Sequence, residues 1–148
     1  MLPLVQFIAV LATTIFAGAA IYITFVEHPA RMGCSTELAA TEWAPSYKRA
    51  TLMQAPLAII GFLCGTVAWW LGAGGPWLIA ALLILAVVPF TLIVIEPSTN
   101  KPLLAPGRDL SSPETRELLV KWGRLHAVRS VLGFGAAAIF IWQVGCSL

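Results

Sequence analysis

The chain has 148 residues, of which 59% are hydrophobic and only 11% are charged. An ordinary soluble domain carries about 25% charged residues, and it needs them to cover its surface. The net charge of +2, without a basic stripe, also excludes a typical nucleic-acid-binding protein. The composition indicates one integral membrane domain over residues 1–148, with the lipid bilayer as its surroundings and no nucleic acid as a partner.

Three long stretches without any charged residue predict the membrane spans. They are residues 1–26, 50–95 and 130–148. A membrane-spanning helix needs about 20 apolar residues, so the middle stretch holds two spans, separated by the Gly- and Pro-rich segment 72–76. No basic residue precedes the first span, which favours a retained helix over a cleaved signal peptide. The sequence predicts an all-α, antiparallel bundle of four transmembrane helices, at about 4–26, 47–71, 76–96 and 113–144.

Prolines and capping residues set the expected ends of these helices. We expect Pro29 to end the first helix, because proline disfavours helix at the residue before it. Ser46 is expected to cap the second helix, and Pro97 to stop the third. The fourth has a good start, since Ser112 can cap it and Pro113 suits its first position. This helix exceeds the roughly 30 Å hydrocarbon core, so its charged first turns are expected to project from the membrane.

The basic residues predict the orientation in the membrane. All nine Lys and Arg residues lie in two segments, 27–49 and 97–129. With four spans, these two segments face the same side. The positive-inside rule places that side in the cytoplasm. We therefore expect a multi-pass membrane protein with both termini outside and two long cytoplasmic loops.

Ionisable and aromatic side chains gather at this charged end, and such groups near a span are functional candidates by default. On the fourth helix, Trp122, His126 and Arg129 are four and three residues apart and share one face. A buried arginine needs an anionic or carbonyl partner, which we expect to be Glu96 or Glu27. A purely structural ion pair is the simpler alternative. Snorkelling of long side chains would also produce part of this cluster.

A second polar face runs along the second helix through Tyr47 and Gln54. Gln54 lies about two turns into the membrane, so its amide needs a hydrogen-bond partner there. An interhelical hydrogen bond and a bound ligand account for it equally well. Trp43 before this helix, and His28 after the first, lie at the same end of the bundle.

Short segments with a recognisable order and spacing are spread over nearly the whole chain. They are Gly18-Ala19-Ala20-Ile21-Tyr22 with His28-Pro29-Ala30, Trp43 with Tyr47, Leu52-Met53-Gln54-Ala55, Pro97 with Asn100-Lys101-Pro102-Leu103, and Trp122-x-x-Leu125-His126-x-x-Arg129. In these segments the chain resembles the anthrone oxygenase-like membrane family. The resemblance implies a four-span fold. It also implies an oxidoreductase, a monooxygenase that oxidises a hydrophobic aromatic molecule, an anthrone, to an anthraquinone with O₂ and without a cofactor.

Such a reaction needs a base, donors for an enolate oxygen and a flat apolar pocket. We expect His126 to be the base, since histidine titrates near neutral pH. Asn100 and Arg129 are expected to donate to the oxyanion, and His28 or Glu96 to act as the acid when a peroxide loses water. The expected catalytic residues are thus His126, Arg129 and Asn100, and the expected substrate-binding residues are Trp43, Tyr47, Gln54, Glu96, Trp122 and His28.

Two other functions stay open. A haem or metal ion near His28 and His126 would make the chain a membrane redox protein, since four-helix bundles hold bis-histidine haem. Spacings such as H-x-x-x-H are absent from the sequence, so we expect no metal ligands, and the family resemblance implies no cofactor. The other alternative is a non-catalytic binder or transporter of a hydrophobic small molecule. Four spans are few for a transporter unless the protein forms a homo-oligomer.

Overall fold

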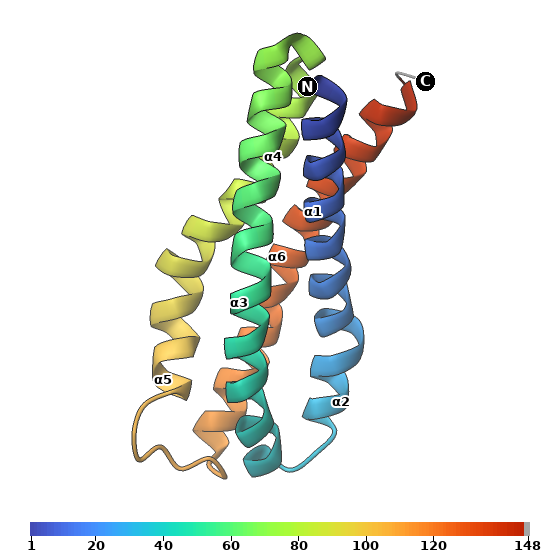
Figure 1. Cartoon of the computed structure of the whole chain (residues 1–148). Coiled ribbons are helices and arrows are strands. Elements are labelled where there is room, and N and C mark those ends of the chain that lie inside the picture. Colours follow the sequence, from blue (N-terminus) through green and yellow to red (C-terminus); the bar gives the residue numbers. More distant parts are fainter. Residues whose placement is uncertain (147–148) are drawn as a thin grey trace.

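The computed structural model describes residues 1–146 as a rod of long helices (Figure 1). Four helical segments run its length in alternating directions, and each is long and apolar enough to cross a membrane. The N-terminus and the end of the last helix therefore lie at the same end of the rod (Figure 1). The predicted fold class, an all-α bundle of four membrane-spanning helices, is confirmed. Residues 147–148 of the predicted domain lie outside the described residues.

The four spans are built from regular α-helices, and the first three also contain π-helical segments at or near their ends. In the bundle α1 and α4 each pack against both α3 and α6, and α3 and α6 also contact each other. The spans are α1 (Leu2–Tyr22), η1 (Ile23–Glu27) and α2 (His28–Met32); α3 (Thr36–Ala68) and η2 (Trp69–Ala73); α4 (Gly75–Phe90), η3 (Thr91–Asn100) and α5 (Lys101–Leu103); and α6 (Pro113–Cys146).

Small residues let the helices pack closely, as is usual where helices meet inside a membrane. Buried alanines recur in each cluster of the core, from Ala9 near one end to Ala39 near the other. Glycines serve the same purpose on α6. At Gly133 an added Cβ would lie 2.7 Å from the ring of Phe16, so the glycine provides the space that this α1 side chain fills.

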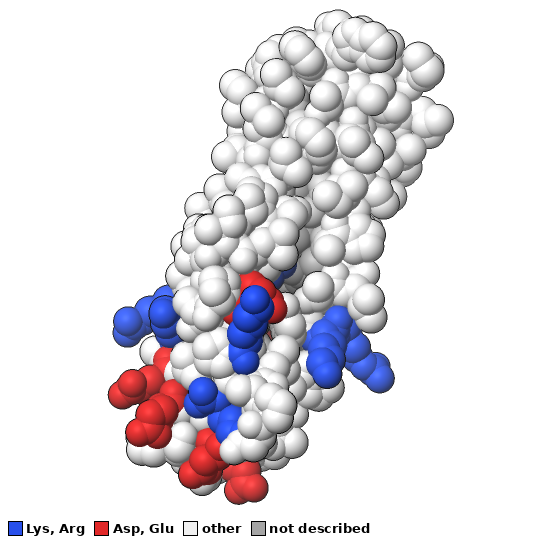
Figure 2. All heavy atoms as spheres, turned by 90° about the vertical axis from the view of Figure 1, so that its left-hand side faces the viewer, with Lys and Arg blue, Asp and Glu red and all other residues white. Residues whose placement is uncertain are grey.

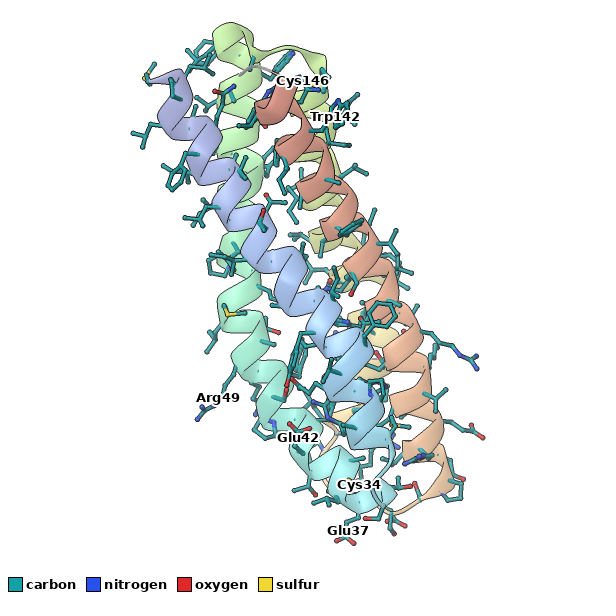
Figure 3. The ribbon with its side chains drawn as sticks, turned by 90° about the vertical axis from the view of Figure 1, so that its right-hand side faces the viewer. Cys34, Glu37, Glu42, Arg49, Trp142 and Cys146 are labelled. Atoms are coloured by element: carbon teal, nitrogen blue, oxygen red, sulfur yellow. The ribbon has the colours of Figure 1, made fainter. Side chains whose placement is uncertain are left out.

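The outer surface is apolar along most of the rod, as a lipid-facing surface must be. Figure 2 shows charged side chains gathered at one end of this face and none over the rest of it. Cys34 and Glu37 lie at the charged end, and Trp142 and Cys146 at the opposite end (Figure 3). Large apolar side chains are exposed in between, among them Phe7, Leu52 and Val131.

Two predicted helix ends are wrong because the chain continues through the prolines. The first span passes Pro29 to reach Met32, and the third passes Pro97 to reach Leu103. A proline ring removes an amide donor and collides with the carbonyl four residues earlier. In both spans the helix widens into a π-helical segment there, with five-residue bonds such as the one from the His28 amide to the Ile23 carbonyl. The wider turn accommodates the ring without ending the helix.

The predicted start of the second helix is also wrong. This helix begins at Thr36, and Ser35 caps it by accepting a hydrogen bond from the Leu38 amide. Ser46 lies inside the helix and donates to Glu27 instead. The two long loops expected at the charged end are therefore short connections, 33–35 and 104–112, and most of that end is helical.

The other two predicted boundaries agree with the structure. Ser112 accepts a hydrogen bond from the Thr115 amide, and α6 begins at Pro113 as expected. The chain reverses between the second and third spans at Gly72 and Gly74, whose φ angles of 93° and 98° favour glycine. The 34 residues of α6 correspond to about 51 Å, so its charged first turns lie beyond a hydrocarbon core of roughly 30 Å.

We predict that Gly133→Ala lowers the midpoint of thermal unfolding in detergent. The new methyl group meets the buried Phe16 ring, and overpacking costs about 1–3 kcal/mol, whereas alanine improves helix propensity by about 1 kcal/mol. Gly18→Ala on α1 is the matched control, because nothing lies within 4 Å of its new Cβ. The control is expected to be as stable as the wild type or more so. Equal stability of the two variants would contradict the close packing at Gly133.

We predict that a membrane-impermeant thiol reagent labels Cys146 in intact cells and labels Cys34 only after permeabilisation. Both thiols are exposed and lie at opposite ends of the rod (Figure 3). The positive-inside rule places the Cys34 end in the cytoplasm. Cys34→Ser and Cys146→Ser variants assign the labelled site. Labelling of Cys34 in intact cells would reverse the predicted orientation.

Candidate functional site

A cavity of about 130 Å³ lies between α3, α4 and η3. Its inner wall is buried and includes Phe16 of α1, Gln54 of α3 and Arg129 of α6. Its rim includes Thr51 and Leu92, which are exposed and belong to the charge-free part of the chain. The cavity therefore opens sideways toward lipid, and the polar side chains of Gln54 and Arg129 lie at its floor.

Arg129 lies at this floor without a carboxylate partner. Its side chain is buried, and Nη2 donates to Oε1 of Gln54 at 2.8 Å. No ion pair to Arg129 occurs among the described residues, so the predicted pairing with Glu96 or Glu27 is wrong. The Nε atom of Arg129 and the Nε2 atom of Gln54 are buried donors with no hydrogen-bond partner in residues 1–146. The cavity wall thus contains two hydrogen-bond donors that have no acceptor within residues 1–146.

Competing partners explain why neither carboxylate reaches Arg129. Glu27 pairs with Arg31, which also pairs with Glu42 and so ties α2 to α3. Glu96 lines the same cavity as Arg129, but its Oε2 accepts hydrogen bonds from Tyr47 Oη at 3.2 Å and Asn100 Nδ2 at 2.9 Å.

The cavity wall thus carries one carboxylate and one guanidinium that do not neutralise each other by direct contact. Each is held by neutral side chains. Because the surroundings are apolar, both groups act strongly on any polar atom that enters the cavity.

A block of aromatic rings lies beside the cavity at the charged end. Tyr47, which lines the cavity, stacks on Trp43 with the ring centroids 5.2 Å apart. The rings of Trp43 and Trp122 are nearly perpendicular, with their centroids 5.8 Å apart. The Trp122 ring in turn contacts both histidine rings. Its centroid lies 5.1 Å from that of His28 and 4.8 Å from that of His126. The four other residues of this block, Trp43, Trp122, His28 and His126, are buried and lie outside the cavity lining.

The two histidines have different surroundings. Nδ1 of His28 has no hydrogen-bond partner in the described residues 1–146, and its ring fills the space beside Gly123, where any larger residue would collide with it. Nδ1 of His126 lies 3.1 Å from the hydroxyl of Thr24. Within residues 1–146, no group of three or more His, Cys, Asp or Glu side chains is arranged to hold a metal ion.

The structure places the nine predicted site residues in two adjoining groups. Asn100 reaches the cavity only through its bond to Glu96. Sequence reasoning did not predict Phe16 or Thr24. Phe16 has no polar atom that would mark it as a site residue. Thr24 could have been found, because its hydroxyl lies within an apolar span. The cavity contains Tyr47, Gln54, Glu96 and Arg129, and the aromatic block contains Trp43, Trp122, His28 and His126.

We predict that the double variant Gln54→Leu with Arg129→Met is as stable as the wild type or more so. Replacing buried polar or charged groups by apolar ones of similar size is often neutral or stabilising. Arg31→Met is the control and is expected to lose about 1–3 kcal/mol. Removing one partner of a fully buried ion pair costs about 3–5 kcal/mol. The cost is expected to be smaller here, because the two carboxylates left without Arg31, those of Glu27 and Glu42, are partly exposed to solvent. Unfolding in detergent measures both. Strong destabilisation of the double variant would assign Arg129 to the fold instead of to a site.

The sequence of this chain is similar to those of known proteins. A family model described as anthrone oxygenase matches residues 43–139, from α3 into α6. The anthrone oxygenase tpcL of Aspergillus fumigatus is 35% identical over 75 residues, which are 49% of this chain and 47% of the relative. The anthrone oxygenase ptaC of Pestalotiopsis fici is 32% identical over 110 residues, which are 62% of this chain and 74% of the relative. No solved structure matches.

Proposed function

The chain belongs to the anthrone oxygenase family, and we propose that it is a membrane oxygenase that oxidises a hydrophobic, anthrone-like phenolic substrate with O₂. The observation that carries this proposal is the pair of unpartnered donors, from Arg129 and Gln54, at the floor of a cavity that opens toward lipid. Donors aimed at a developing oxyanion in a site without water are the usual way to stabilise such a charge.

The position of the cavity suits a substrate dissolved in the bilayer. Its exposed rim offers apolar contacts at Leu92 and Ala55. Its volume of about 130 Å³ is below the roughly 300–1,000 Å³ of typical ligand pockets, so α3 and η3 must move apart to admit three fused rings. The π-helical geometry of η3 favours this, because such segments have less regular hydrogen bonds and occur frequently at functional sites.

The proposed reaction converts an anthrone and O₂ into an anthraquinone and water. A base removes one proton from the ring carbon opposite the carbonyl, and the electron pair moves onto the carbonyl oxygen. This anion transfers one electron to O₂, and the resulting superoxide and substrate radical combine to form a carbon–oxygen bond. Protonation of the peroxide, loss of the second hydrogen from that carbon and cleavage of the O–O bond then release water and form the second carbonyl.

The side chains of this chain supply the groups that the reaction needs. Arg129 and Gln54 would hold the oxyanion. His126 lies one helical turn before Arg129 on α6 and is the proposed base, reached when the cavity extends toward the charged end. Glu96 is the proposed acid for the peroxide. Asn100, which donates to Glu96, is assigned to orienting that carboxylate instead of contacting the substrate.

No cofactor is needed for this scheme, because an electron-rich anion reduces O₂ directly. The alternative of a haem held by both histidines has to accommodate the Trp122 ring, which contacts His28 and His126. Metal and haem content is therefore measured on the same preparations as activity.

We predict that purified protein in nanodiscs converts an anthrone to the anthraquinone, followed by absorbance, with one O₂ consumed per product. His126→Gln is expected to lower the rate by about 10²–10⁴, the usual contribution of a general base. Arg129→Gln is expected to lower it through loss of the oxyanion contact. Arg124→Gln is the matched control, because Arg124 lies on the same helix and is exposed.

Other outcomes would redirect the assignment. A full loss in Glu96→Gln together with wild-type rates in His126→Gln would transfer the base to the carboxylate that lines the cavity. Ligand binding without turnover would favour the non-catalytic binder. Activity proportional to bound iron or haem would overturn the cofactor-independent reaction.

A further inference from the structure

Two hydroxyl groups, from Thr24 of η1 and Ser130 of α6, lie close to the imidazole of His126. The Oγ1 atom of Thr24 is 3.1 Å from Nδ1 of His126 and 2.8 Å from Oγ of Ser130. Ser130 in turn donates to the carbonyl oxygen of Ala20 at 2.9 Å. His126 and Ser130 are buried, so these three side chains form a short chain of hydrogen bonds within the apolar part of the bundle.

Counting the protons fixes the direction of every bond in this chain. Each hydroxyl has one proton to give, and a carbonyl oxygen can only accept. The Ser130 proton goes to the Ala20 carbonyl, and its second neighbour at 3.4 Å, the His126 carbonyl, is also an acceptor. Ser130 must therefore accept from Thr24. Since the Thr24 proton is then used, the contact with the imidazole requires a proton on Nδ1 of His126.

We propose that Thr24 and Ser130 are positioning residues that hold neutral His126 with its proton on Nδ1. In this tautomer Nε2 carries the lone pair and is the nitrogen that accepts a proton. The role in turnover rests on the proposed function, whereas the tautomer does not. When Nε2 accepts the substrate proton, the bond from Nδ1–H to Thr24 becomes charge-assisted and strengthens.

The location of Thr24 supports this assignment. It belongs to η1, and π-helical segments of this kind occur frequently at functional sites. Ser130 follows Arg129 directly on α6. About one turn of this helix therefore carries the proposed base His126, the proposed oxyanion contact Arg129 and the hydroxyl of Ser130, which accepts from Thr24. An unsatisfied hydroxyl in this apolar region would be costly, and the chain satisfies both hydroxyls through His126 and Ala20.

Nitrogen NMR of protein labelled with ¹⁵N-histidine tests the tautomer directly. The chain has two histidines, so the signals lost in His126→Gln assign His126. At about pH 8, above the ordinary titration range of histidine, we expect Nδ1 protonated and Nε2 unprotonated in the wild type. A wild-type spectrum with the proton on Nε2 would overturn the proposal, whether or not the protein turns over an anthrone.

Substitutions then separate positioning from simple packing. Thr24→Ser keeps the hydroxyl and is expected to keep the tautomer, whereas Thr24→Val removes the acceptor and is expected to shift the proton toward Nε2. Ser130→Ala frees the Thr24 proton to turn to Nδ1, so it is expected to produce the same shift by a different route. Thr14→Val, on the exposed side of α1, is the matched control and is expected to change nothing.

Turnover is expected to follow the tautomer. Thr24→Val and Ser130→Ala should lower kcat by between about 10-fold and about 10⁴-fold, the larger value being the loss when a catalytic histidine has the wrong tautomer. Thr24→Ser should restore it. An unchanged tautomer and kcat in both variants would overturn the proposal. If the wild type has the Nδ1–H tautomer but no activity, the proposed function fails and the tautomer assignment stands.

Discussion

A buried guanidinium without an acidic partner among residues 1–146 is the constraint on which the rest of the site depends. In an apolar span a cation is costly, and Arg129 has one hydrogen bond to Gln54 in compensation. The acidic residues nearby are already engaged, Glu27 with Arg31 and Glu96 with Tyr47 and Asn100. The bundle therefore keeps its positive charge open toward the cavity.

Two of the three π-helical segments of the bundle, η1 and η3, lie beside the candidate site. The first span widens into the π-helical segment η1 just before Pro29, and the third widens into η3, which contains Pro97. Thr24 belongs to η1, and Glu96 and Asn100 belong to η3. The regular parts of the helices carry the small-residue contacts that fix the bundle. Departures from α-helical geometry thus place polar side chains at the site without breaking the spans.

The sequence was sufficient to predict the four-helix architecture, because charge-free stretches and helical spacing depend only on residues that are near one another in the chain. The shared face of Trp122, His126 and Arg129 follows from their spacing alone. The partner of Arg129 was predicted wrongly, since that choice depends on which carboxylates other helices have already engaged. The helix ends at Pro29 and Pro97 were also wrong, because a π-helical turn can absorb a proline and leaves no clear sign in the sequence.

The rim and the floor of the cavity favour ligands of different charge. The apolar, lipid-facing rim admits a molecule that is uncharged in the bilayer, since an ion would lose its hydration there. The floor presents Arg129, which only an acceptor with negative charge satisfies fully. A ligand that meets both demands enters neutral and becomes an anion in place. An aromatic weak acid has this property, and a quinone does not. The same two surfaces would therefore favour entry of the substrate and release of the product.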